Sequence, residues 1–339
     1  MTLPVTIRPQ AANADGGPRR SGPPAAVAHC YRRLAHLLLV VNPSASAVTA
    51  RERVVIHKAL AADHQVEMVE TSRRGHATRL AQGAAAAGTD VVGVLGGDGT
   101  PNEAANGLAR SETAMAVLPG GSTNVFARTL RLPNDPIEAT GAVLEALEHQ
   151  ALRRVGLGSV NGRYFLFHTG IGFDAAVVAQ VERRAALKRY AGHPLYAYAT
   201  LSTWFRHYDR SRPRFAVHVP DEAVVDDAYF AVCSNTDPYT FMGKRPLHLA
   251  PDATFDRGLA MFSLRSLSLG TVATVVSSAL LRGSRARRHR LSHYRSDLSE
   301  VTVRGHGPFP YQVDGDYLGE IDELIFRHEP DALLLVTPP

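Results

Sequence analysis

Cysteine is nearly absent from this chain. The 339 residues include only Cys30 and Cys233, and two isolated thiols exclude a disulfide scaffold, an iron–sulfur cluster and a zinc ribbon. Hydrophobic residues make up 45% of the chain and charged residues 20%, as in ordinary globular proteins. Such a chain can bury a core without disulfides or zinc, and at about 150 residues per domain we expect two domains.

Long apolar runs are also missing. The longest candidates, residues 37–41 and 272–281, fall short of the ~18–20 residues that a membrane span requires. Arg19 and Arg20 are not followed by the apolar segment of a signal peptide, so we expect a cytoplasmic protein. The net charge of +5 is compatible with nucleic acid, a phosphorylated ligand or an anionic membrane, and by itself selects none of them.

Two common nucleotide-binding motifs have no match. The chain contains no Walker A pattern and no spaced Gly-x-Gly-x-x-Gly after its first expected strand, so ordinary P-loop and Rossmann sites are poorly supported. Instead, apolar runs that end in turn residues alternate with helical stretches, which is typical of parallel strands in a doubly wound α/β domain. These strands are expected at residues 37–41, 66–70, 91–95 and 114–118.

The pattern divides the chain into three segments. Residues 1–33, rich in Pro, Gly, Ala and Arg, are predicted to be a disordered extension, and residues 34–152 form the α/β domain. Short β-type runs predict a mainly antiparallel, β-sandwich-like domain over residues 153–339, with the last strand able to return to the first domain. Because ligands of open α/β sheets bind beyond the carboxyl ends of the strands, we expect the active site in the cleft between the domains.

Two glycine clusters follow expected strands. Residues 96–100 read Gly-Gly-Asp-Gly-Thr and residues 120–124 read Gly-Gly-Ser-Thr-Asn. Backbone N–H groups of such loops can close on a phosphate, and the next helix favours its charge. Asp98 would repel a phosphate unless a divalent cation lies between them. A structural glycine turn and a capped helix start are the alternatives.

Further motifs accompany these loops in order along the chain. They are Val41-Asn42-Pro43, Thr71 with Gly75-His76-Ala77, residues 96–103, 118–128, 170–175 and 250–253, and Val313-Asp314-Gly315-Asp316. Together they resemble the diacylglycerol kinase catalytic family, which includes sphingosine kinases and soluble bacterial lipid kinases. NAD kinases and phosphofructokinases share Gly-Gly-Asp-Gly-Thr, but Asn102-Glu103 and the second loop make the resemblance specific.

The resemblance implies an enzyme that binds ATP and Mg²⁺ over the first domain and a lipid substrate in the second. By analogy, Asp98 acts with Mg²⁺ on the ATP phosphates. The residues implied in nucleotide binding are Asn42, Pro43, Thr71, Gly96, Gly97, Asp98, Gly99, Thr100, Asn102, Glu103, Ser122, Thr123 and Asn124.

The resemblance also implies a carboxylate base for the lipid hydroxyl. Relatives usually read Asp-Gly-Glu where this chain has Asp-Gly-Asp, so Asp316 keeps the carboxylate but shortens its reach by one methylene. Glu320 is a nearby alternative for the base. The structural interpretation of the Asp-Gly motif is a hairpin turn without a catalytic role. Two acidic positions of the family are absent, with Val125 and Arg257 in their places; Asp256, displaced by one residue, is the remaining candidate for a second Mg²⁺.

The leading hypothesis is ATP-dependent phosphorylation of a lipid hydroxyl, with diacylglycerol converted to phosphatidic acid. The alternatives are a sphingoid-base or other lipid kinase, then an NAD kinase, then a catalytically inert regulator that binds nucleotide or lipid. Basic runs at residues 183–189 and 284–290 suggest peripheral docking on an anionic membrane, with a solvated surface as the alternative. No nucleic-acid-binding motif accompanies the charge, so we expect no nucleic-acid partner. The sequence does not decide between a monomer and a homodimer.

Overall fold

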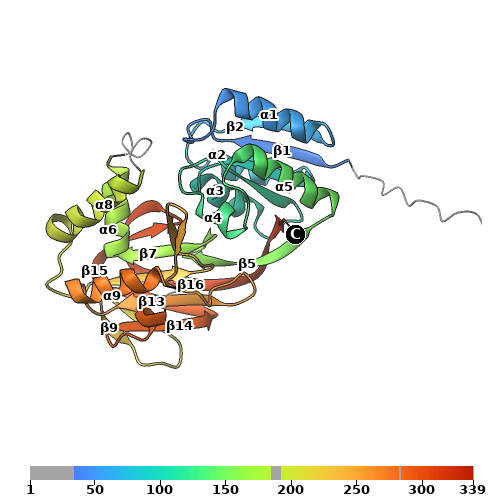
Figure 1. The fold of residues 1–339 in the computed structure, drawn as a ribbon. Coiled ribbons are helices and arrows are strands. Elements are labelled where there is room, and N and C mark those ends of the chain that lie inside the picture. The colour runs from blue at the N-terminus through green and yellow to red at the C-terminus, as the bar shows by residue number, and fades with distance from the viewer. Residues whose placement is uncertain (1–33, 185–191, 282–283, 339) are drawn as a thin grey trace, which may run out of the picture. The chain divides into compact units, whose positions relative to one another are not determined.

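The computed structural model describes residues 34–184, 192–281 and 284–338. From Leu34 onward the chain forms one compact unit, shown in Figure 1. The extension predicted for residues 1–33 lies outside the described residues, as do residues 185–189 of the first basic run.

The first part of the chain alternates parallel strands with helices. Its strands lie in the order β4-β3-β1-β2, and all neighbouring pairs are parallel. The elements are β1 (His36–Val41), α1 (Ala50–Ala61), β2 (Gln65–Glu70), α2 (His76–Ala86), β3 (Val91–Gly96), α3 (Gly99–Leu108), β4 (Ala114–Pro119), α4 (Val125–Thr129) and α5 (Pro136–Glu148). The four strands predicted from apolar runs are confirmed.

Helices cover both faces of this parallel sheet. Right-handed crossovers put α1 on one face, because the chain steps outward from β1 to β2, and α2 and α3 on the other, because it then returns past β1 to β3 and β4. The contacts agree: α1 packs on α5, and α2 packs on α3. The predicted doubly wound fold is therefore confirmed.

Local signals explain where these helices begin. The Thr49 hydroxyl accepts from the Glu52 amide at 3.2 Å, and the Glu52 carboxylate accepts from the Thr49 amide at 2.7 Å, which forms a capping box at the start of α1. Asp135 caps α5 directly before Pro136, a residue suited to the first helical position. The starts of α1 and α5 are thus set by short sequence patterns.

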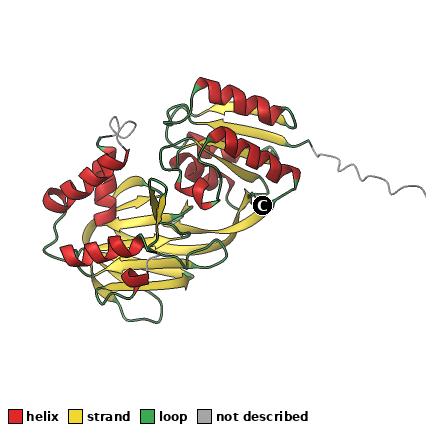
Figure 2. Cartoon of the chain, viewed as in Figure 1, coloured by secondary structure: helices red, strands yellow, loops and turns green. Residues whose placement is uncertain are grey.

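The second part is built mainly from antiparallel strands, as Figure 2 shows. These are β5 (Leu152–Val160), β6 (Arg163–Phe165), β7 (His168–Gly172), β8 (Phe215–His218), β9 (Val225–Ala228), β10 (Phe230–Ser234), β11 (Thr240–Met242), β12 (Arg245–Leu247), β13 (Leu259–Leu264), β14 (Ser292–Leu298), β15 (Glu300–Val313) and β16 (Asp316–Val336). Its helical elements are α6 (Phe173–Glu182), α8 (Gly192–Ser202), the π-helical η1 (Thr203–His207), α9 (Leu269–Ala279) and α10 (Ser284–Arg287). A β-rich second part, as predicted, follows the α/β part.

One sheet joins the two parts, in the order β14-β13-β10-β7-β15-β16-β4-β3-β1-β2. The junction is β16, which pairs antiparallel with β5 and, at Leu335, parallel with Met115 of β4. Apolar residues near its end, including Leu333 and Val336, are buried in the core of the first part. The end of the chain therefore anchors the second part to the first.

Candidate active site

The two glycine loops lie against each other at the carboxyl ends of β3 and β4. A Cβ on Gly121 would stand 2.8 Å from the Gly97 Cα, and the Gly120 amide donates to the Gly96 carbonyl at 2.8 Å. Side chains are excluded here because the two backbones touch. The predicted phosphate-binding residues of both loops thus form one continuous backbone surface.

Asp98 connects the first loop to the helix that follows the second. Its Oδ2 accepts from the Val125 amide and its Oδ1 from the Phe126 amide, both at 3.0 Å. Burial lowers the pKa of Arg128, and the negative charge of Asp98 opposes that shift. The carboxylate that the sequence assigns to Mg²⁺ therefore also positions the start of α4.

The predicted nucleotide contacts of the first two strands lie beside this surface. Asn42 Nδ2 donates to Thr100 Oγ1 at 3.1 Å, and the Thr71 amide donates to the Val41 carbonyl at 2.8 Å. Pro43 is exposed next to Asn42. The structure thus brings the residues predicted at the ends of β1 and β2 to the edge where the first glycine loop begins.

The polar residues of the second loop differ in exposure. Ser122 is exposed and Thr123 half-buried, whereas Asn124 is buried. Asn124 has a φ of 51°, and its side chain accepts from the Gly121 amide at 2.8 Å and donates to Asn134 Oδ1 at 2.9 Å. Ser122 and Thr123 can therefore face a ligand, while Asn124 shapes the loop.

Asn102 and Glu103 face other parts of the protein. Asn102 is 1% exposed; its Nδ2 donates to Asp314 Oδ2 at 2.8 Å, and its Oδ1 accepts from Arg163 at 2.8 Å. Glu103 accepts from two amides in residues 75–77, at 2.8 and 3.2 Å. The Asn-Glu pair thus joins α3 to the second part of the chain and to the start of α2, which explains why these motifs occur together.

The Asp-Gly-Asp motif forms the turn between β15 and β16. Val313 pairs with Asp316, and Asp314 and Gly315 have φ angles of 47° and 83°, which two-residue hairpin turns favour. The hairpin turn that the sequence offers as the structural interpretation is therefore present, and it sets the directions in which the two carboxylates point.

Asp314, the first residue of this turn, is buried and 3% exposed. Its carboxylate accepts from three successive amides, those of Leu166, Phe167 and His168, at 2.7 to 3.1 Å, and from Asn102 Nδ2. Burial raises the pKa of Asp314 to about 6, although these hydrogen bonds act in the opposite direction. Asp314 thereby ties the turn to the β6–β7 connection and, through Asn102, to the helix of the phosphate loop.

Asp316 lies beside the phosphate loop. Its Oδ2 is 3.3 Å from the position that a Cβ on Gly99 would take, and its Oδ1 accepts from Arg74 at 3.1 Å. Arg74 also donates to Glu182 of α6 at 3.2 Å, and Glu182 accepts from the Tyr317 amide at 3.1 Å. The structure thus places the predicted base next to the predicted phosphate site.

A buried hydrogen-bond chain supports the turn from the other side. Asp174, 5% exposed, accepts from Gln312 Nε2 at 2.9 Å and from the Tyr239 hydroxyl, and desolvation raises its pKa. Gln312 Oε1 in turn accepts from the Gly315 amide at 2.7 Å. Gly170 leaves room for this arrangement, because a Cβ there would overlap the Asp174 carboxylate. The motif at residues 170–175 is thus connected by hydrogen bonds, through Gln312, to the Asp-Gly-Asp turn.

Candidate metal ligands are dispersed. Among the residues that the structure describes, no three His, Cys, Asp or Glu side chains gather where they could hold a metal ion. Mg²⁺ is usually held by one or two carboxylates together with substrate phosphates and water, so the single carboxylate of Asp98 beside the loops fits a nucleotide-bound Mg²⁺. Asp256 lies on the surface in an ion pair with Arg153, and Glu320 is also exposed.

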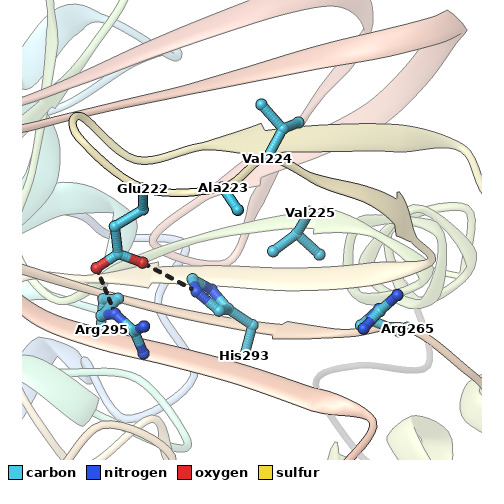
Figure 3. A pocket seen from close by; sticks show the side chains of 7 residues that line it. All are labelled: Glu222, Ala223, Val224, Val225, Arg265, His293 and Arg295. Carbon is cyan, nitrogen blue, oxygen red and sulfur yellow. Dashed lines mark hydrogen bonds and ion pairs between the residues drawn. The ribbon is translucent and has the colours of Figure 1, made fainter.

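A surface pocket of about 450 Å³ lies between the β8–β9 connection and β14 and includes none of the predicted site residues. Figure 3 shows that Glu222 binds both His293 and Arg295 there. The remaining cation, Arg265, pairs with Asp227 at 2.6 Å. The charges of this pocket are thus matched within the protein, and it offers no second phosphate site.

The geometry can be compared with known proteins. Residues 36–160 match the model of the diacylglycerol kinase catalytic domain. This part of the chain thus carries a diacylglycerol kinase catalytic domain, as the sequence resemblance indicated, and the chain is a lipid kinase enzyme. Over 295 residues the kinase is 27% identical to a diacylglycerol kinase of Staphylococcus saprophyticus, covering 84% of this chain and 89% of that protein. It is 35% identical over 182 residues to a protein of Chromohalobacter salexigens named probable lipid kinase YegS-like, covering 52% and 56%.

Solved structures share the fold of the kinase. The crystal structure of a diacylglycerol kinase from Bacillus anthracis aligns with a TM-score of 0.65 at 20% identity, over 91% of this chain and 98% of that one. No helix in the described ranges of the kinase is long and apolar enough to cross a membrane.

Several residues around the site were not singled out by sequence patterns. They are Arg74, Arg163, Glu182, Tyr239 and Gln312. Each acts on a residue far away in the sequence, as Arg74 does on Asp316, 242 positions later. The signals available were weak: Arg74 precedes the Gly75-His76-Ala77 motif, and Gln312 lies two residues before Asp314.

Proposed function

We propose that the kinase transfers the γ-phosphoryl group of ATP to the hydroxyl of diacylglycerol and forms phosphatidic acid. The observation that carries this proposal is the approach of Asp316 to within 3.3 Å of the Cβ position at Gly99. A hydroxyl held at the Asp-Gly-Asp turn would meet a phosphate held by the glycine loops. The names of the Staphylococcus saprophyticus and Bacillus anthracis relatives support diacylglycerol as the lipid.

The nucleotide would lie over the carboxyl ends of the parallel strands. Helix α3 begins at Gly99, and its dipole favours a phosphate at that end, although the Thr100 amide already donates to the Gly97 carbonyl at 2.9 Å and Pro101 has no N–H. Asn42, Thr71, Ser122 and Thr123 border this surface, and Asp98 would hold Mg²⁺ on the phosphates. Phosphoryl transfer depends mainly on positioning and on neutralising charge, so the chain itself contributes a close-packed backbone cradle and a base.

Asp316 is the first candidate for that base, because it lies beside the phosphate loop and keeps 23% of its side chain exposed. Arg74 would hold its carboxylate in place. Asp314 is the second candidate, because burial raises its pKa to about 6, and a general base works best when its pKa lies near the operating pH.

The substrate is tested with labelled ATP and Mg²⁺ against diacylglycerol, sphingosine, ceramide, phosphatidylglycerol and NAD. We expect label in phosphatidic acid. Label in a sphingoid base or another lipid would show that the substrate is a different lipid while the enzyme is still a lipid kinase. Label only in NADP would overturn the lipid proposal. No label in any acceptor, with ATP still bound, would favour an inert regulator, the alternative suggested by Val125 in place of a family acid.

We also propose that the kinase works in the cytoplasm and visits the membrane peripherally. Its lipid substrate requires access to a bilayer, and the second basic run leaves Arg285, Arg288 and Arg290 exposed. Arg287 of the same run is bound to Asp252. Several exposed cations of this kind would each attract an anionic surface by about 1 kcal/mol.

A further inference from the structure

Large apolar side chains are exposed on α8 and η1. Tyr198, Leu201 and Phe205 are 51%, 60% and 70% exposed, and their spacing of three and four residues puts them along one side of the helical segment. The opposite side is buried, with Leu195, Ala199 and Trp204 in one hydrophobic cluster. An ordinary surface helix has mainly polar residues on its solvent side, whereas this segment exposes three large apolar side chains beside Thr200, Arg206 and His207.

Helix α9 has the same character. Leu269 and Val276 are 72% and 52% exposed, and Leu281, just beyond the helix, is 66% exposed. Its inner side is buried through Val275 and Ala279. The whole helix reads Leu-Gly-Thr-Val-Ala-Thr-Val-Val-Ser-Ser-Ala and contains no charged residue.

The two segments cover the same face of the sheet. Val272 of α9 packs on the cluster that contains Leu195 of α8 and Trp204 of η1, and the same cluster includes Phe173 and Val177 of α6. Figure 1 shows α8 and α9 on one side of the β-rich part. We call their exposed residues, Tyr198, Leu201, Phe205, Leu269, Val276 and Leu281, the apolar face.

Most exposed charges beside the apolar face are positive, and the exposed Asp209 is paired with Arg212. Arg206 and Arg210 follow Phe205, and both are exposed; the guanidinium of Arg210 lies over the Trp204 ring at 4.5 Å. Arg285, Arg288 and Arg290 follow Leu281 within ten residues and are exposed. Neither α8, η1 nor α9 contains Asp or Glu. Exposed apolar side chains flanked by arginines suit the interface of an anionic bilayer, where the former enter the acyl boundary and the latter meet the headgroups.

The apolar face is also connected to the candidate site. Helix α6, on which α8 packs, carries Glu182, and Glu182 binds Arg74 and the Tyr317 amide beside Asp316. A bilayer that meets α8 and α9 would therefore lie one helix layer from the turn that receives the lipid hydroxyl.

From these observations we propose that the apolar face, with its flanking arginines, is the surface by which the kinase docks on an anionic lipid bilayer. The proposal rests on the proposed function, because only a lipid substrate requires this approach. A second copy of the chain is the competing occupant, since two such faces could also cover each other.

The test measures binding of the full chain to sedimentable vesicles, without ATP or diacylglycerol. Vesicles of phosphatidylcholine with phosphatidylglycerol are compared with vesicles of phosphatidylcholine alone. The variants are Leu201→Glu with Phe205→Glu, and Val276→Glu with Leu281→Glu. The matched control is Val54→Glu with Ile137→Glu, which adds the same charge at apolar residues 53% and 43% exposed on α1 and α5.

We expect each variant of the apolar face to bind anionic vesicles more weakly by about tenfold or more, and the control to bind like the original chain. Neutral vesicles and about 1 M salt should also weaken binding. Activity on a dispersed short-chain diacylglycerol should be kept by all variants, which shows that they fold. Because the binding assay contains no substrate, a failure of the kinase reaction alone would overturn the proposed function and leave this proposal standing.

Three results would overturn the docking surface. The first is no binding of the original chain to anionic vesicles. The second is binding of either variant equal to that of the original chain. The third is a dimer in solution that both variants dissociate while the control does not, because the apolar face would then be covered by a second copy.

Discussion

The two halves of the candidate site are held together by different kinds of contact. At the phosphate loops, backbone lies on backbone, as Gly97 and Gly121 show. At the Asp-Gly-Asp turn, side chains do the holding: Asp314 accepts from three amides about 150 positions away, and Gln312 binds the Gly315 amide. The first half should therefore be sensitive to added volume, and the second to changes of charge and hydrogen bonding.

The largest effect is expected for Asp316→Asn, which removes the proposed base and keeps its shape. General-base catalysis contributes about 10²–10⁴-fold, so kcat should fall by that order while the KM for ATP changes little. Steady-state kinetics with diacylglycerol and varied ATP measure both quantities.

Two further variants complete this comparison. Glu320→Gln, on the exposed part of β16, should leave kcat unchanged. If Asp316→Asn keeps normal turnover, Asp316 is not the base, and the buried Asp314 becomes the first candidate.

Asp314 should make stability depend on pH. Its pKa is raised from 3.8 to about 6, so its protonated form favours the folded state. This contribution is fully present below the unfolded value and is lost as the pH rises through about 6. The loss corresponds to about 3 kcal/mol. The Asp314→Asn variant cannot ionise there, and its free energy of unfolding should lack this decrease.

Urea unfolding between pH 4 and pH 7.5 measures the difference. Glu320→Gln, a neutral substitution at an exposed carboxylate, should keep the pH dependence of the original chain. An Asp314→Asn variant whose stability follows the same curve as the original chain would show that Asp314 has an ordinary pKa.

A methyl group should disturb the first half of the site. In Gly121→Ala the new Cβ would stand 2.8 Å from the Gly97 Cα and 3.1 Å from Asn124 Oδ1, so one loop must move. Overpacking of this kind costs about 1–3 kcal/mol, and the KM for ATP should rise with it. Gly141→Ala in α5 is the matched control, because nothing lies within 4 Å of that Cβ and alanine favours a helix by up to about 1 kcal/mol. Equal ATP kinetics in the two variants would contradict the packed-loop description.

The α/β part of the fold could be predicted because its signals are local. Apolar runs predict its strands, and the capping residues Thr49 and Asp135 mark helix starts. Each of these signals is contained in a few neighbouring residues. The long strands were harder to predict: β16 covers Asp316–Val336, whereas the sequence predicts only short β-type runs in this part of the chain. Its first residues are half exposed and include Gly and several acids, so they lack the apolar alternation of a strand.

The site shows a different limit of sequence patterns. The motifs identified the loops and the turn, but a motif does not reveal whether a polar side chain faces a ligand or the protein. Asn102 and Asn124 were assigned to the nucleotide, yet the structure buries both side chains among protein partners. The partners of Asn102 are Asp314 and Arg163, far away in the sequence, so only the folded chain brings them together. Asn124 instead binds the Gly121 amide of its own loop.

Arg74 is the exposed contact to the Asp-Gly-Asp turn, and its removal should have the smallest effect on stability. Its side chain is 64% exposed, and exposed ion pairs contribute about 0.2–1 kcal/mol, so Arg74→Ala should change the free energy of unfolding by less than about 1 kcal/mol. Its effect on turnover should be larger, because Asp316 would lose the group that fixes its carboxylate. Arg212→Ala removes an exposed pair with Asp209 outside the site and should leave turnover intact. If both variants retain full activity, the buried link from Asn102 to Asp314 is sufficient to align the phosphate loop with the turn.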